Sequence, residues 1–495
     1  MRWVALVVGV LAACSRYDTY QCSESEQCVR AGVAGVCEEG GVCSFPDDKC
    51  DSGKRYEDHA ANGLAGQCTP YCGREGLACC DTGPACTGNS YCNNGTCETC
   101  VVDVGLGRRT ICSIKYDGTL WCAGANGSGE LGISDTGDPS AKPVQVVDDN
   151  DEPLTGVVNV SGGRDFNCAV KMDGTVWCWG TNQVGQLGSG GPMPTPVTPP
   201  ATQTYPAGPE DRAVQVITTQ DQPLTGAAEV VCGGAGNISI NQSRFCCARM
   251  RSGAVQCWGS NAGGELGDGT TTARSRAAPV SGLGGVSELQ AGADHVCAKT
   301  TNNQVVCWGR NGDGQVFDNS QTNRNKPVMV AVTSSFSAGR FYTCIVGPDS
   351  SISCAGWNSH NRFGIGTGTH YDGDDYPSPV QTLTMLGGSV FTGVEEVAAG
   401  GVTCAKMKDK TLYCWGDDAY GTTGTGTPST VPRQVIFEDG TPLTNIKRVF
   451  GRYQKACAET NDGMLYCWGR GDSGEMGDGT FENRGYPMPY SLTCP

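Results

Sequence analysis

The sequence predicts an all-β protein, a seven-bladed β-propeller preceded by an N-terminal disulfide-rich module. Three observations predict it. The 73 glycines, 25 prolines and only 17% charged residues are typical of short strands joined by tight turns. A hairpin-like segment recurs seven times after residue 100. The 31 cysteines indicate a disulfide framework, which forms in an oxidising compartment and not in the cytosol.

The acidic charge of the chain excludes one class of partner. The formal net charge is -16, and the sequence shows no basic stripe. A protein that binds nucleic acid needs such a stripe to neutralise phosphates, so we expect no nucleic-acid partner. An acidic surface otherwise keeps a protein soluble.

Residues 1–13 resemble a bacterial lipoprotein signal peptide. Met1 and Arg2 precede an apolar stretch that ends in Leu11-Ala12-Ala13-Cys14. Cleavage before Cys14 would leave its thiol for a lipid, and each buried methylene contributes about 0.8 kcal/mol to membrane binding. The alternative is an ordinary signal peptide with Cys14 in a disulfide. No later stretch approaches the roughly 20 apolar residues of a membrane helix. We therefore expect a lipoprotein of the cell envelope, at the outer membrane or cell surface, held by its lipid alone.

Residues 14–100 form the predicted disulfide-rich module. Cysteines are dense here and aliphatic residues are few, so disulfides must replace a hydrophobic core. Part of the spacing resembles knottin-like modules, although spacing does not give the connectivity; these residues are Cys72, Cys79, Cys80, Cys86, Cys92 and Cys97. A zinc site over residues 92–100 is the disfavoured alternative, because structural zinc thiolates suit reducing compartments.

Residues 101–495 contain the seven repeats, with a period of about fifty residues. A proline-rich insertion at residues 191–209 separates the second repeat from the third, and residues 233–245 form another. Each repeat carries two cysteines ten positions apart: Cys112 and Cys122, Cys168 and Cys178, Cys247 and Cys257, Cys297 and Cys307, Cys344 and Cys354, Cys404 and Cys414, Cys457 and Cys467.

The spacing of the cysteines predicts a hairpin with a three-residue loop. Gly118, Gly174 and Gly463 stand where such a loop needs a left-handed residue. Counting outward from the loop centred on Asp117 pairs the two cysteines at a site without backbone hydrogen bonds, where the Cα atoms lie about 4.5 Å apart. That distance permits a disulfide. We therefore expect one disulfide in every blade, each contributing roughly 2 to 4 kcal/mol.

A Trp-Gly pair follows the second cysteine in five repeats. A tryptophan that recurs at the same position is more simply explained as a core residue than as a ligand-stacking one. The motif Asn-x-x-Gly-x-Leu-Gly follows and predicts a tight loop between blades. The five tryptophans are Trp179, Trp258, Trp308, Trp415 and Trp468.

These repeats resemble those of the chromosome-condensation-regulator family, whose members form seven-bladed propellers. Three repeats depart from the pattern: the first has Ala123 for the tryptophan, the fourth has Val316-Phe317 for Leu-Gly, and the fifth moves its tryptophan to Trp357. The best-known member acts on a small nuclear GTPase, which an exported chain would not meet. A secreted bacterial member inhibits β-lactamases, so the resemblance implies a scaffold that binds protein outside the cytosol.

The remaining cysteines can then be assigned in part. Cys232 with Cys246 can bridge the insertion before the third cysteine pair. We pair Cys100 with Cys494 as a hypothesis, because a propeller must join its two ends. The twelve cysteines between residues 22 and 97 stay unassigned.

Catalytic chemistry has little support in the sequence. The four histidines, His59, His295, His360 and His370, show no spacing that suggests a triad or a metal helix. His360 and His370 flank an acidic loop with Asp372, Asp374 and Asp375. A solvated loop is the favoured interpretation over a cation site. We therefore predict no enzyme, no cofactor and no metal.

The predicted function is an exported scaffold that binds a protein partner, acting as a monomer. The two loop-bearing faces of a propeller suit that role. The alternative is a structural or adhesive envelope component with the disulfide-rich module as a stalk. A polysaccharide-processing enzyme is less favoured, and it would need acidic residues converging at the propeller axis.

Overall fold

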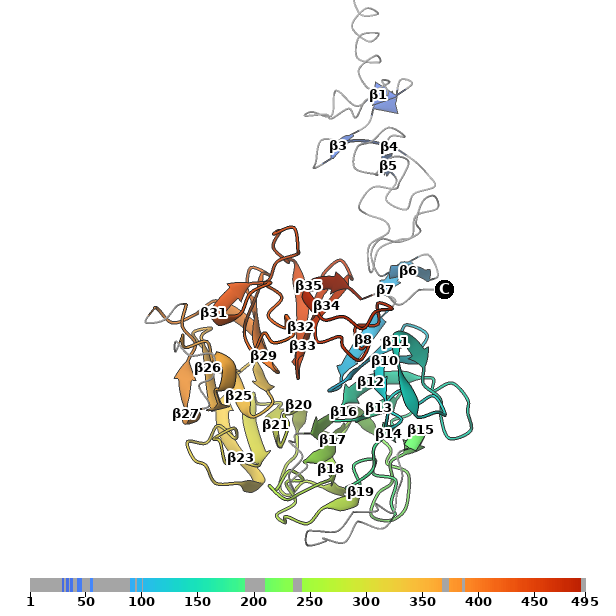
Figure 1. Cartoon of the computed structure of the whole chain (residues 1–495), viewed down its shortest axis with the longest axis vertical. Coiled ribbons are helices and arrows are strands. Elements are labelled where there is room, and N and C mark those ends of the chain that lie inside the picture. The colour runs from blue at the N-terminus through green and yellow to red at the C-terminus, as the bar shows by residue number, and fades with distance from the viewer. Residues whose placement is uncertain are drawn as a thin grey trace, which may run out of the picture. The chain divides into compact units, whose positions relative to one another are not determined.

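A computed structural model describes residues 101–490 except 192–209, 235–242, 367–373 and 385–387, together with short strands between residues 29 and 99 (Figure 1). The chain divides into two compact units, one mainly of Met1–Cys100 and the other of Val101–Asn461 and Leu465–Ser491. In the described part, no helix has the length and apolar character needed to span a membrane. The predicted signal peptide, with Cys14, lies outside the described residues, as do Cys100 and Cys494.

The described part of the first unit consists of short strands. β1 (Val29–Arg30) pairs with β2 (Val33–Ala34), and β6 (Ser90–Asn93) pairs with β7 (Thr96–Thr99). β3 (Val36–Glu38), β4 (Val42–Pro46) and β5 (Lys54–Tyr56) form an antiparallel sheet.

The second unit is a propeller of seven four-stranded antiparallel sheets, as predicted. Each blade uses four strands that are consecutive in the sequence, running in order through the blade (Figure 1). Blade 1 has β8 (Val101–Leu106), β9 (Thr110–Lys115), β10 (Leu120–Asn126) and β11 (Gly137–Gln145); blade 2 has β12 (Val157–Gly162), β13 (Phe166–Lys171), β14 (Val176–Gly180) and β15 (Glu210–Gln215); blade 3 has β16 (Ala227–Gly234), β17 (Arg244–Met250), β18 (Val255–Gly259) and β19 (Arg274–Pro279). Blade 4 has β20 (Val286–Ala291), β21 (His295–Thr300), β22 (Gln304–Gly309) and β23 (Arg324–Val332); blade 5 has β24 (Phe336–Ala338), β25 (Tyr342–Val346), β26 (Ile352–Trp357) and β27 (Asp375–Gln381), with a short 3₁₀ turn, η2 (Ser359–Asn361). Blade 6 has β28 (Val394–Ala399), β29 (Val402–Met407), β30 (Leu412–Gly416) and β31 (Ser429–Gln434); blade 7 has β32 (Ile446–Arg452), β33 (Lys455–Thr460), β34 (Leu465–Gly469) and β35 (Arg484–Pro489).

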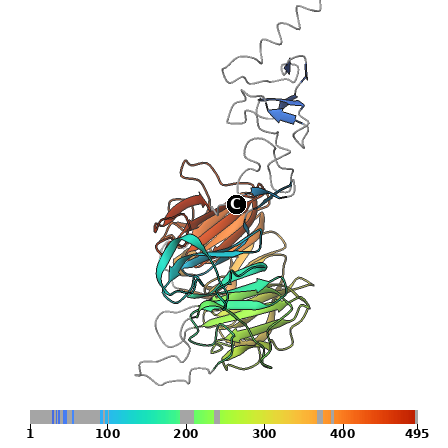
Figure 2. The same ribbon diagram turned by 90° about the vertical axis from the view of Figure 1, so that its right-hand side faces the viewer.

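The first strand of each blade lies next to the first strands of the neighbouring blades, so these seven strands surround the axis. Figure 2 shows the blades from the side. Because each sheet is built from one continuous stretch, the ring closes between blades 7 and 1 without a shared sheet. Individual hydrogen bonds hold that junction instead: Lys455 Nζ donates to the Arg108 carbonyl at 2.9 Å, and the Gly479 amide donates to the Ala141 carbonyl at 2.8 Å.

The predicted hairpin register is confirmed. Ile114 pairs with Leu120 and Cys112 with Cys122, and the Lys115 amide donates to the Thr119 carbonyl at 2.9 Å. Gly118 has φ 75°, the left-handed value that the three-residue loop requires. Blades 4, 5 and 6 place a non-glycine residue at this position with the same sign of φ: Asn303, Ser350 and Lys410.

The recurring tryptophans are fully buried, which confirms them as core residues. Each packs against the preceding blade and donates its indole Nε1–H to a backbone carbonyl there, at 2.8 to 2.9 Å. The pairs are Trp179 with Glu130, Trp258 with Gln186, Trp308 with Glu265, Trp415 with Arg362 and Trp468 with Thr422. The tryptophan therefore joins two blades, as well as filling the core.

Two of the three repeats that depart from the pattern lack this bond. In blade 5, Ala355 replaces the tryptophan, and the Thr343 hydroxyl donates instead to the Gln315 carbonyl of blade 4 at 2.7 Å. In blade 1, Ala123 is buried at the same position. In blade 4, Phe317 takes the glycine position with φ 67°. All three blades nevertheless keep four strands.

Candidate functional site

A disulfide joins the second and third strands of every blade. The Cα atoms of the seven pairs lie 4.0 to 4.1 Å apart, and all of these cysteines are buried. An eighth disulfide, Cys232–Cys246, joins the first strand of blade 3 to its second strand. Blade 3 therefore carries two disulfides, on adjacent residues of β17.

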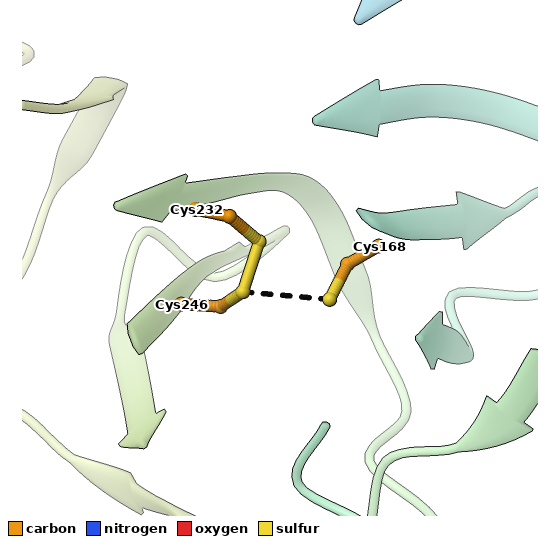
Figure 3. Close-up of side chains that lie close together, drawn as sticks. All are labelled: Cys168, Cys232 and Cys246. Carbon is orange, nitrogen blue, oxygen red and sulfur yellow. Dashed lines mark hydrogen bonds between the residues drawn. A yellow bond between two sulfur atoms is a disulfide. The ribbon is translucent and has the colours of Figure 1, made fainter. Parts of the chain in front are cut away.

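Cys168 of blade 2 lies beside the second disulfide of blade 3, with 3.4 Å between the sulfur atoms of Cys168 and Cys246 (Figure 3). Sulfur atoms of Cys168, Cys232 and Cys246 all lie within 4.8 Å of one another, a spacing that could suit a metal ion. A metal binds cysteine as a thiolate, however, and all three sulfurs are in disulfides, Cys168 with Cys178. The cluster is two packed disulfides at the interface of blades 2 and 3.

His295 is fully buried between blades 4 and 5, where it has polar neighbours on both sides. Its Nε2 lies 2.8 Å from Thr343 Oγ1, and its Nδ1 lies 3.7 Å from Asp294 Oδ1. The arrangement resembles an acid, a base and a hydroxyl nucleophile. The Thr343 hydroxyl already donates its proton to the Gln315 carbonyl, so His295 must donate to Thr343 and cannot act as its base. We assign His295 a structural role.

The other histidines add no site among the described residues. His360 hydrogen-bonds through Nδ1 to Ser359 Oγ at 2.6 Å in η2. His59, His370 and Asp372 lie outside the described residues, so the predicted acidic loop is described only at Asp374 and Asp375, which are exposed.

A cavity of about 250 Å³ lies on the propeller axis, lined by the first strands of all seven blades. At one end, acidic residues occupy equivalent positions on four of these strands: Asp103, Glu229, Glu288 and Glu396. Acidic residues thus converge at the axis, as a polysaccharide-processing site would require.

Each of these carboxylates has a basic partner. Glu229 pairs with Arg249 at 2.7 Å, Glu288 with Lys299 at 2.5 Å and Glu396 with Lys406 at 2.9 Å. The partners are directly opposite on the second strand of the same blade. Asp103 pairs at 3.4 Å with Arg448, which comes from blade 7. Burial raises the pKa of Asp103 and of Glu229. These four carboxylates are held in ion pairs, unlike the open carboxylate pair of a glycosidase.

The other end of the axis is lined by the loops that join the first and second strands. Here Arg452 and Tyr453 of blade 7 reach blade 3, which is not its neighbour in the ring. Arg452 donates to the Cys232 carbonyl, and the Tyr453 hydroxyl to the Gly234 carbonyl at 3.2 Å. The pocket beside them holds about 10 Å³, room for about one water molecule. Blade 7 therefore narrows this end of the axis.

The sequence was compared with known families. Residues 117–170, 173–235 and 462–492 match the profile described as "Regulator of chromosome condensation (RCC1) repeat", and residues 157–186 and 286–315 match a second profile of the same description. The matches fall in blades 1, 2, 3, 4 and 7, and two of them run from the later strands of one blade into the first strand of the next.

Two relatives show how far the similarity extends. The ultraviolet-B receptor UVR8 of Arabidopsis thaliana is 26% identical over 388 residues, which are 75% of this chain and 77% of the receptor. The human E3 ubiquitin-protein ligase HERC2 is 28% identical over 361 residues, which are 64% of this chain but only 7% of the ligase. The similarity to HERC2 thus covers a small part of that protein.

Solved structures show the same fold. Human WBSCR16 superimposes with a TM-score of 0.57 and 18% identity, covering 78% of this chain and 94% of the other. Yeast RCC1 (Prp20), in its complex with Kap60, gives a TM-score of 0.57 and 18% identity over 75% of this chain and 83% of its own. At this identity the likeness concerns the fold.

Proposed function

The chain carries regulator of chromosome condensation repeats on a seven-bladed propeller, and from that premise we propose that it is an exported scaffold that binds a protein partner. Propellers of this kind bind proteins: the yeast relative was crystallised with Kap60 and studied for its binding to Gsp1p and histones. Those partners belong to the yeast protein. What this chain shares with it is the fold, whose two faces present loops on a rigid ring.

The observation that carries the proposal is the disulfide in every blade. Each one closes a short hairpin and fixes the strands that hold the loops, so the faces are held rigid before a partner arrives. The same disulfides support export, because the cytosol keeps thiols reduced. The lipoprotein pattern ending at Cys14 supports anchoring at the bacterial cell envelope.

Cross-linking on intact cells tests the proposal. The tagged chain is cross-linked in place, purified and analysed by mass spectrometry. We expect one protein partner in stoichiometric yield. Recovery of only envelope polysaccharide, or of copies of the chain itself, would overturn the proposal in favour of a structural role.

A Cys14→Ala variant tests the anchor separately. Without the lipid-bearing thiol, the chain should move from the membrane fraction to the soluble exported fraction while its propeller stays folded. If the variant stays in the membrane fraction to the same extent as the wild type, the lipid anchor is wrong.

A further inference from the structure

Arginines gather at the end of the axis that blade 7 narrows, although the chain as a whole has a net charge of -16. They come from the loops between first and second strands in several blades and from the start of β17. The six residues are Arg108, Arg109, Arg164, Arg244, Arg340 and Arg452.

Four of the six surround one carboxylate. Asp165 has Arg109 at 3.4 Å, Arg164 at 3.5 Å, Arg244 at 3.6 Å and Arg108 at 3.7 Å, and its own side chain is only 12% exposed. An ordinary surface ion pair joins one cation to one anion. Here a second carboxylate, Glu130, reaches only Arg109, at 3.6 Å, and burial raises its pKa.

The other two arginines have no carboxylate partner among the described residues. The Arg340 guanidinium lies 5.1 Å from the centre of the Phe341 ring, and that of Arg452 lies 5.5 Å from the Tyr453 ring. Both line the narrow pocket at the axis. Aromatic contacts place a guanidinium but leave its charge uncancelled.

The arginines also repel one another. The pKa of Arg108 is lowered, first by burial and then by its neighbours Arg164 and Arg109. Burial likewise lowers the pKa of Arg340, and Arg362 and Arg108 add to that effect. Like charges held close together and partly out of water raise the energy of the folded protein. Buried groups of like charge are common at functional sites, where a ligand of opposite charge can balance them.

The six arginines together are called the arginine mouth. We propose that the arginine mouth binds an acidic segment of the protein partner, through hydrogen bonds from the guanidinium groups to aspartate or glutamate carboxylates. The inference rests on the proposed function and adds the chemistry of the partner. Guanidinium forks bind carboxylates in pairs of parallel hydrogen bonds, which gives both strength and orientation. Asp165 already occupies one such place within the protein.

Two observations favour a short protein segment over an extended polyanion. The six arginines lie near the axis, whereas the outer loops of the same face carry exposed acidic residues such as Asp135 and Asp374, and arginines there are ion-paired, as Arg470 is with Asp472. A long nucleic acid or polysaccharide would meet those charges as well. In addition, the Phe341 and Trp357 rings pack 5.6 Å apart beside the mouth and are partly exposed, and aromatic residues with arginine are typical of protein interfaces.

Fluorescence anisotropy with a labelled hexaglutamate peptide tests the proposal on the full chain with its disulfides intact. The test variant is Arg108→Gln with Arg340→Gln. The matched control is Arg251→Gln with Arg433→Gln, two exposed arginines away from the mouth that remove the same charge. We expect at least tenfold weaker binding by the test variant, wild-type binding by the control, and equal thermal unfolding of all three proteins. Added salt should weaken wild-type binding because the attraction is between charges.

Equal affinity of the two variants, or no binding by the wild type, would overturn the proposal. Heparin binding more tightly than the peptide, and losing affinity in the test variant, would overturn it in favour of an extended polyanion. The cross-linking experiment repeated with the test variant separates the two levels of inference. If the variant captures the same partner in the same yield, the arginine mouth is wrong and the scaffold function stands. If the wild type captures none, the scaffold function itself fails.

Discussion

Replacing Glu265 by Gln should make the stability of the protein less dependent on pH. Glu265 lies in the loop after β18, where its Oε2 accepts the Gly263 amide at 2.8 Å and its Oε1 accepts the Ser243 hydroxyl at 2.9 Å. Burial raises the pKa of this carboxyl to about 7. Blades 2 and 4 have Gln186 and Gln315 at the same position, each accepting the equivalent backbone amide. The repeat itself therefore shows that glutamine fits.

The magnitude follows from the two pKa values. Below about pH 4.5 the Glu265 carboxyl is protonated in both the folded and the unfolded chain. Between about pH 4.5 and 7 the unfolded chain loses this proton while the folded chain keeps it, which favours the unfolded chain as the pH rises. Stability is therefore lost with rising pH. One pKa unit corresponds to about 1.4 kcal/mol, so the loss between pH 5 and 8 is roughly 2 to 3 kcal/mol.

Urea unfolding with the disulfides intact, at pH values from 5 to 8, measures this effect. The free energy of unfolding of Glu265→Gln should rise relative to the wild type by roughly 2 to 3 kcal/mol between pH 5 and 8. Glu152→Gln, at an exposed position, controls for the loss of one negative charge. A difference between wild type and Glu265→Gln that stays the same from pH 5 to 8 would refute the reasoning.

Three further predictions concern the blade architecture. Cys404→Ser with Cys414→Ser removes the disulfide of blade 6 and should lower the free energy of unfolding by about 2 to 4 kcal/mol; an unchanged urea midpoint would contradict a stabilising role for the blade disulfides. Trp308→Phe keeps a buried ring but loses the bond to the neighbouring blade, and should cost about 1 to 3 kcal/mol in the same assay. Gly253 has φ 79°, so Gly253→Val should lower the free energy of unfolding by more than about 1 kcal/mol. Gly253→Asn should lower it clearly less, since Asn303 has the equivalent position and a positive φ in blade 4. Equal losses for the two variants would show that the backbone angle is not the reason.

The blade could be predicted from the sequence because its determinants are local. The glycine of the hairpin loop and the two cysteines stand within eleven consecutive residues, so strand pairing can be counted from the loop outward. The Cys232–Cys246 disulfide also lies within one blade. The sequence identified the tryptophans as core but gave no sign that their indole groups bond to the preceding blade. That bond joins Trp258 to Gln186, far away in the sequence.

The arginine mouth could not be predicted from the sequence because its members come from different blades. Arg108 belongs to blade 1, Arg340 to blade 5 and Arg452 to blade 7, and although each follows a glycine at the same point of its repeat, they are more than a hundred residues apart in the sequence. A search for a basic stripe finds nothing there. Only the closure of the ring brings these residues together, so the net charge of the chain gave no guide to the charge at its axis.

The two ends of the axis differ in how their charges are balanced, and that difference separates architecture from function. At the acidic end, blades 3, 4 and 6 place an acidic residue of the first strand opposite a basic residue of the second strand, as Glu288 faces Lys299. Blade 7 reverses the pair, with Arg448 opposite Glu459, and blade 1 has Asp103 opposite the uncharged Ile114. Arg448 ion-pairs with both carboxylates, so the reversal supplies a cation across the junction where the ring closes. Charges at this end are therefore matched within the fold.

Charge matching at the arginine end is less complete. Four of its arginines share Asp165, and Arg340 and Arg452 have no carboxylate partner among the described residues. An arginine follows the glycine near the end of the first strand in blades 1, 2, 5 and 7, whereas blade 4 has Ala293 and blade 6 has Gly401 there. Blades 4 and 6 keep four strands without this arginine, so the fold of a blade does not require it. A negatively charged partner would explain the excess of arginines, because it would supply the missing carboxylates.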